Sequence, residues 1–224
     1  MRVRAAIAAW LVAGCAATGA PDSTFEQKFT WYRYLAGDDV RAACAADGPI
    51  RFRFVYNAVF TEEVRALDLD AAPGGGGWLE SRRYQGSRVL DVASAGPLNV
   101  PQRGAVFLNA DKVAELLDAI TASGFAGAAE TGLILRSDSH YAVASGCRGG
   151  EFKLHGYAWN TLGGLGYAAL LERLDPIGIP WPKPVDTGAP SGAIDDTRAE
   201  ARESSEVFFV IEMGQTGLRG VNEL

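Results

Sequence analysis

The chain has 224 residues, of which 48% are hydrophobic and 21% are charged, which is the balance of an ordinary globular protein. Its net charge of −6 argues against nucleic acid as a partner, because nucleic-acid-binding surfaces are usually strongly basic. The length is sufficient for one domain with a hydrophobic core and flanking segments, and we expect that single domain over residues 25–184.

The first residues have the pattern of a bacterial export signal. Arg2 and Arg4 supply positive charge, and an apolar stretch follows over residues 5–12. This stretch is too short to span a bilayer, which takes roughly 20 apolar residues, but it has the length of a signal-peptide core. We therefore predict that residues 1–14 are a signal peptide.

The signal segment ends in Val12-Ala13-Gly14-Cys15, which resembles the lipobox of bacterial lipoproteins. The resemblance covers this segment alone. It implies cleavage before Cys15, attachment of lipid to the Cys15 thiol and anchoring to a membrane through acyl chains. Because Ala16 follows instead of an aspartate, the resemblance also implies sorting to the outer membrane, facing the periplasm. The alternative is an ordinary secretory signal that contains a cysteine by chance.

With Cys15 lipidated, Cys44 and Cys147 remain as a pair in an oxidising compartment, and we predict a disulfide between them. In the loop-entropy model, closing a loop of about 100 residues stabilises a fold by about 4 to 5 kcal/mol. The alternative is two separate buried thiols. We expect no metal and no other cofactor, because two cysteines fall short of a four-ligand shell and the spacing of the histidines indicates none.

The first half of the expected domain is rich in strand patterns. A small, polar tether over residues 15–24 leads to an aromatic cluster, which consists of Phe25, Phe29, Trp31, Tyr32 and Tyr34. The clearest strand is predicted at 50–60, where apolar and polar side chains alternate with period two. Glycines at 74–77 indicate a loop, and residues 94–104 are interpreted as a connection. Further strands are predicted at 63–69, 78–84 and 88–92.

The second half of the domain combines helices with strands. Residues 109–124 have apolar side chains at helical spacing, and a second helix is predicted at about 165–174. Strands are predicted at 133–136, 141–147 and 151–159. The pattern as a whole favours an α+β fold, namely a mainly antiparallel sheet with two helices packed on one face.

The C-terminal part divides into two segments. Residues 185–205 are small, acidic and poorly patterned, which is typical of a flexible linker. Residues 206–224 are interpreted as a C-terminal strand or tail, because 207–213 are too apolar to leave in water. That apolar segment either joins the chain's own sheet or adds a strand to an envelope protein partner.

One strand face carries the candidate ligand-binding residues, which are Lys153, His155, Tyr157 and Trp159. The alternative for this face is an ordinary, partly solvated surface of an antiparallel sheet. Five arginines form a second candidate, a basic patch on one sheet face, unless acidic neighbours neutralise them across the strands. These arginines are Arg51, Arg53, Arg65, Arg82 and Arg83.

No catalytic motif accompanies the two histidines, since the chain contains no G-x-S-x-G nucleophile elbow. We therefore predict no catalytic residues and a non-enzymatic binding or assembly role in the periplasm. The alternative is a small envelope hydrolase that uses His140 or His155 as its base, with Asp138, Ser139 and Ser145 as possible neighbours of His140.

Overall fold

The computed structural model describes residues 24–85, 100–186, 209–214 and 217–221. The predicted signal peptide, Cys15 and nearly all of the tether lie outside this part of the chain, as do the strand predicted at 88–92 and most of the linker. Among the helices in the described part, none is long and apolar enough to cross a membrane.

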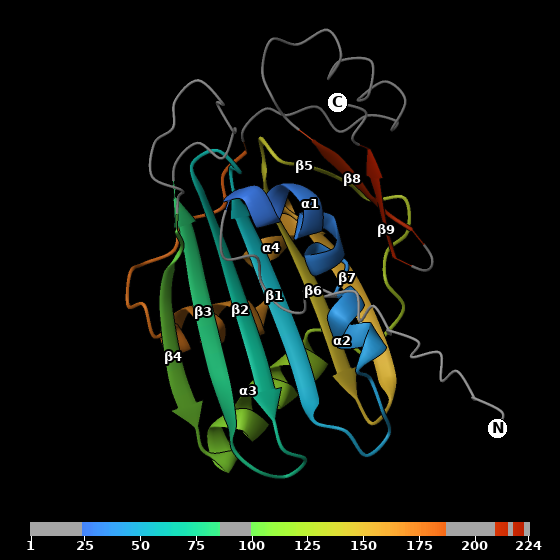
Figure 1. The fold of residues 1–224 in the computed structure, drawn as a ribbon, viewed down its shortest axis with the longest axis vertical. Coiled ribbons are helices and arrows are strands. Elements are labelled where there is room, and N and C mark those ends of the chain that lie inside the picture. Colours follow the sequence, from blue (N-terminus) through green and yellow to red (C-terminus); the bar gives the residue numbers. More distant parts are fainter. Residues whose placement is uncertain (1–23, 86–99, 187–208, 215–216, 222–224) are drawn as a thin grey trace, which may run out of the picture.

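The main layer is a six-stranded antiparallel sheet with the strand order β4-β3-β2-β1-β6-β7 (Figure 1). The first four strands form a meander because each pairs with its predecessor along the chain, and β6 then returns to lie beside β1. The strands are β1 (Ile50–Ala58), β2 (Glu63–Ala71), β3 (Gly77–Gln85), β4 (Gln102–Leu108), β6 (His140–Arg148) and β7 (Glu151–Ala158).

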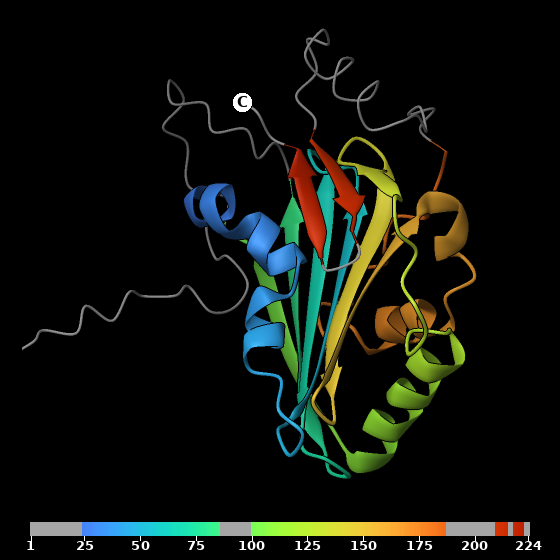
Figure 2. The same cartoon turned by 90° about the vertical axis from the view of Figure 1, so that its right-hand side faces the viewer.

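One face of this sheet packs against two helices, α3 (Ala110–Ala122) and α5 (Gly166–Leu174), and we call it the α3/α5 face (Figure 2). Phe52, Phe54 and Tyr56 alternate along β1 and point to it, as the period of two requires. The side chain of Asn109 accepts a hydrogen bond from the backbone N–H of Lys112 and so caps the start of α3.

The opposite face, which we call the α1/α2 face, is covered by α1 (Thr24–Leu35), α2 (Asp38–Ala42) and a small second sheet (Figure 2). The second sheet has the strand order β5-β8-β9. Its strands are β5 (Ile134–Arg136), β8 (Val210–Met213) and β9 (Leu218–Val221). The remaining helix in the described part is α4 (Trp159–Leu162), directly after β7.

The predicted α+β fold is confirmed, and α3 and α5 are the two expected helices on one face. One prediction needs correction, because residues 102–104 begin β4 instead of ending a loop. The N-terminal aromatic cluster, for which no element was predicted, lies on a helix, α1. The apolar segment 207–213 contributes β8, which pairs on one edge with β5 and on the other with β9. Of the two alternatives, the structure therefore has pairing with the chain's own strands.

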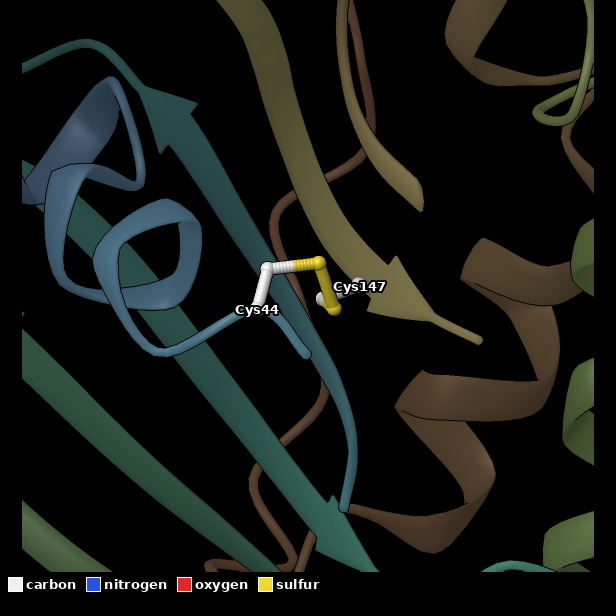
Figure 3. The surroundings of a disulfide bond; sticks show 2 residues. All are labelled: Cys44 and Cys147. Atoms are coloured by element: carbon white, nitrogen blue, oxygen red, sulfur yellow. A yellow bond between two sulfur atoms is a disulfide. The ribbon is translucent and has the colours of Figure 1, made fainter. Parts of the chain in front are cut away.

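The predicted disulfide is present between Cys44 and Cys147 (Figure 3). It joins the loop after α2 to the end of β6, across a sequence separation of 103 residues and a Cα–Cα distance of 5.6 Å. The N-terminal helices are therefore covalently tied to the second half of the sheet.

Candidate functional site

Three of the four predicted ligand-binding residues lie on β7, an edge strand of the main sheet. Lys153, His155 and Tyr157 share the α3/α5 face of this strand, as expected. Their register partners on the neighbouring strand β6 are small, namely Gly146, Ala144 and Ala142. Trp159 does not belong to this strand face, because the strand ends at Ala158 and Trp159 begins α4.

His155 is buried, with 7% of its surface exposed. Its ring lies 4.8 Å from the ring of Phe125 and stacks on Tyr157 with the centroids 6.2 Å apart. Burial lowers the pKa of His155 below its ordinary value, and the charge of Lys153 lowers it further. Its Nε2 atom is buried without a hydrogen-bond partner in the described part of the chain, whereas buried polar atoms are normally paired.

A hollow of about 580 Å³ lies at the edge strand, and we call it the β7-edge hollow. Four consecutive residues, 152–155, line it on one side, and the loop at 127–131, which runs beside β7 in Figure 2, lines it on another. Arg41 of α2 and the glycines Gly214 and Gly217, next to β8 and β9, complete the described lining.

The charge around the β7-edge hollow is positive. The Arg41 guanidinium lies 4.4 Å above the centre of the Phe152 ring, a cation–π contact that orients it over the strand. Lys153 Nζ lies 2.7 Å from a carboxylate oxygen of Glu151, whose side chain is 70% exposed. No carboxylate occurs among the described lining residues of the hollow. The arrangement is therefore suited to an anionic group.

A second hollow of about 230 Å³ lies next to the first, under the end of α3, and we call it the α3 groove. Lys153 lines both hollows. The groove has an apolar floor, and Arg51, Arg148 and Glu151 add charge at its border. The apolar residues of its lining are Ile50, Phe52, Leu117, Ile120 and Phe125.

No protein-family model, no curated protein and no solved structure matches this chain. Among the described residues, no group of three or more His, Cys, Asp and Glu side chains could hold a metal ion. The chemistry of the β7-edge hollow therefore has to be inferred from its own residues and charges.

The five arginines of the predicted basic patch do not share one face. Arg65 and Arg83 point to the α3/α5 face, whereas the other three point to the α1/α2 face. Arg65 is fully buried and donates to Glu63 and Asp175 at 2.7 and 2.9 Å. The alternative of neutralisation by acidic neighbours is therefore the one in the structure, since each of the other four arginines also pairs with a carboxylate.

The structure does not assemble the hydrolase constellation around His140. Asp138 accepts hydrogen bonds from Arg136, at 2.7 Å for the shorter one. His140 packs toward Tyr56 on the α3/α5 face, with the ring centroids 6.1 Å apart. Ser145 pairs in register with Arg53 and so lies on the opposite face of the sheet.

Sequence reasoning found Lys153 and His155 but missed Arg41, Phe152 and the loop at 127–131. Phe152 was overlooked because it points to the face opposite Lys153, and the hollow extends around the strand's edge to both faces. Residues 127–129 are Gly-Ala-Ala, a run of small side chains without a charged or hydrogen-bonding group that would indicate a site.

Proposed function

We propose that this protein is a lipid-anchored, non-enzymatic binding protein of a bacterial envelope, and that it holds a small anionic ligand in the β7-edge hollow. The observation that carries the binding role is the buried Nε2 atom of His155, which lacks a partner in the described structure. His155 lines a hollow whose charged lining residues are Lys153 and Arg41. A carboxylate, sulfate or phosphate group would give the nitrogen a partner and would be attracted to the charges of both cations.

Anion binding should be coupled to proton uptake by His155. In neutral imidazole only one ring nitrogen donates, but in the imidazolium form both do. A bound anion favours the imidazolium form, so affinity is expected to rise as the pH falls toward the ordinary histidine pKa.

Calorimetric titration of the purified chain with sodium sulfate tests this role, because the charge of sulfate is constant between pH 6 and pH 8. We expect saturable binding that is tighter at pH 6, and at least tenfold weaker in Lys153→Met and His155→Gln. Lys112→Met is the matched control, since Lys112 lies on α3 with its side chain 52% exposed and away from the hollow. Wild-type affinity in both hollow variants would refute the binding role.

The anchor is supported by the lipobox resemblance at Cys15, and the disulfide is in keeping with an oxidising compartment such as the periplasm. In a bacterial host grown with radiolabelled palmitate, the protein should carry the label and fractionate with the outer membrane. Cys15→Ser should lose the label and leave the membrane fraction. Cys44→Ser is a control that keeps Cys15, and unlabelled wild-type protein would contradict the anchor.

A further inference from the structure

We infer that the ligand of this site is an anionic amphiphile, a molecule with one acidic head and one alkyl chain, such as a fatty acid. The head would lie in the β7-edge hollow and the chain in the α3 groove. This inference rests on the proposed function, because it names the ligand class for the same site.

The α3 groove has the chemistry of a site for an alkyl chain. Phe52 and Ile120 are buried core residues that reach its surface, and Phe125 closes it on the side of the loop after α3. When methylene groups of a ligand replace water in an apolar hollow, each buried methylene stabilises the complex by about 0.8 kcal/mol. The groove is therefore a favourable place for several carbon atoms of a chain.

The two hollows share a wall. Phe125 and Ala126 line the α3 groove, and the next residues of the same loop, from Gly127 to Ala129, line the β7-edge hollow. Lys153 lines both, with its side chain 29% exposed. An alkyl stem can lie along apolar surface while its charged end contacts a polar group, so this lysine suits the junction between head and chain.

The charges at the border of the α3 groove favour an amphiphile with a negative head. The border of the α3 groove carries the cations Arg148 and Lys153 and one carboxylate, Glu151. Arg51 also lines the groove, but its side chain points to the α1/α2 face and pairs with Asp70. The Glu151 carboxylate already accepts from Lys153 at 2.7 Å. A cationic head would be repelled by Arg148 and Lys153 at this position, whereas an acidic head would be attracted to them.

The volumes agree with such a ligand. The hollows measure about 580 and 230 Å³, and pockets for small organic ligands are generally roughly 300 to 1,000 Å³. The α3 groove supplies an apolar floor, and the β7-edge hollow is lined by His155 and by the cations Arg41 and Lys153. An amphiphile is the ligand class that uses both.

The test is a calorimetric comparison of butyrate, octanoate, octyl glucoside and octyltrimethylammonium, each below its micelle concentration, on the purified full chain. Each added methylene should increase affinity about threefold to fourfold when it is buried, so octanoate should bind at least tenfold more tightly than butyrate. Octyl glucoside and octyltrimethylammonium should bind at least tenfold more weakly than octanoate.

Ala126→Trp fills the mouth of the groove and should weaken octanoate binding at least tenfold, with butyrate and sulfate binding unchanged. Ala122→Trp is the matched control, because Ala122 ends α3, is exposed and lies outside the groove lining. The chain-length series needs no variant and stays decisive if Ala126→Trp folds poorly.

The outcomes separate the two proposals. Sulfate binding without any preference for octanoate over butyrate would overturn the amphiphile and leave the anion site. Equal binding of octanoate and octyltrimethylammonium would also overturn it. Failure of sulfate, butyrate and octanoate alike would overturn the proposed function itself.

Discussion

At the scale of single residues, Arg53 is the most heavily engaged charge of the α1/α2 face. Its side chain is 4% exposed, and its two terminal nitrogens donate to Asp39 at 2.7 and 2.8 Å. Its Nε atom donates to Asp68 at 2.6 Å, and the guanidinium lies 3.8 Å above the ring of Tyr34. One side chain from β1 thus joins α1, α2 and β2.

Replacing Arg53 with Met should destabilise the protein by about 3 kcal/mol, because it leaves two largely buried carboxylates without their main partner. Arg51→Met is the matched control from the same strand, since Arg51 is 34% exposed and pairs with Asp70, whose side chain is 59% exposed. That control should cost less than about 1 kcal/mol. Urea denaturation measures both, and equal losses would contradict the buried cluster's role.

Histidine burial gives a second prediction at this scale. Burial lowers the pKa of His155, and likewise that of His140, below the ordinary value of 6.5. The unfolded chain then binds protons at a higher pH than the folded chain, so stability is unaffected above about pH 6.5 and decreases as the pH falls below it. Urea denaturation between pH 7.5 and pH 5.5 should show this decrease, and His155→Gln should make it smaller. The prediction would be contradicted if the free energy of unfolding depended on pH as steeply in His155→Gln as in the wild-type protein.

At the scale of elements, β8 makes a large contribution to the core of the α1/α2 face. Ile211 and Met213 are fully buried, and the strand lies between β5 and β9. Met213 also packs against the main sheet, because a Cβ added at Gly156 of β7 would come within 2.7 Å of its sulfur. The small sheet is therefore packed onto the main sheet beside the candidate site.

Ile211→Ala should destabilise the protein by about 3 kcal/mol, through lost apolar burial and an incompletely filled cavity. Glu212→Ala is the control, because the neighbouring side chain on β8 alternates to the other side and is only half-buried. Thermal unfolding should show a clear loss for the first variant and a small change for the second. If Ile211→Ala is neutral, β8 does not contribute to the folded core as described.

At the scale of the whole molecule, the Cys44–Cys147 disulfide connects the two halves of the chain. Replacing both cysteines with Ala should lower the free energy of unfolding by about 4 to 5 kcal/mol, the value for a loop of roughly 100 residues. Urea denaturation should show the same loss when the wild-type protein is reduced. Reductant should not change the free energy of unfolding of the double variant. A reduced wild-type protein as stable as the oxidised one would contradict the prediction.

Local patterns in the sequence were sufficient for several elements. The alternation that starts at Ile50 and the helical spacing within 109–124 each depend on neighbours along the chain, and both are confirmed, although the strand ends at Ala58 and the helix at Ala122. The disulfide followed from the assignment of Cys15 to lipid, which left one possible pair, and it is present. The edge strand β4 was missed because its outward side chains are largely exposed and its pattern is interrupted by Gly104.

The sequence by itself determined the α+β class and indicated two residues of the candidate site, Lys153 and His155, because period and residue type are local properties. Only the tertiary structure decided that β6 returns beside β1, that the arginines divide between two faces, and that Arg41 and the loop at 127–131 meet β7. These outcomes depend on the packing of segments distant in the chain. No local period encodes such packing, since the free energy comes from burying one segment's apolar face against another's.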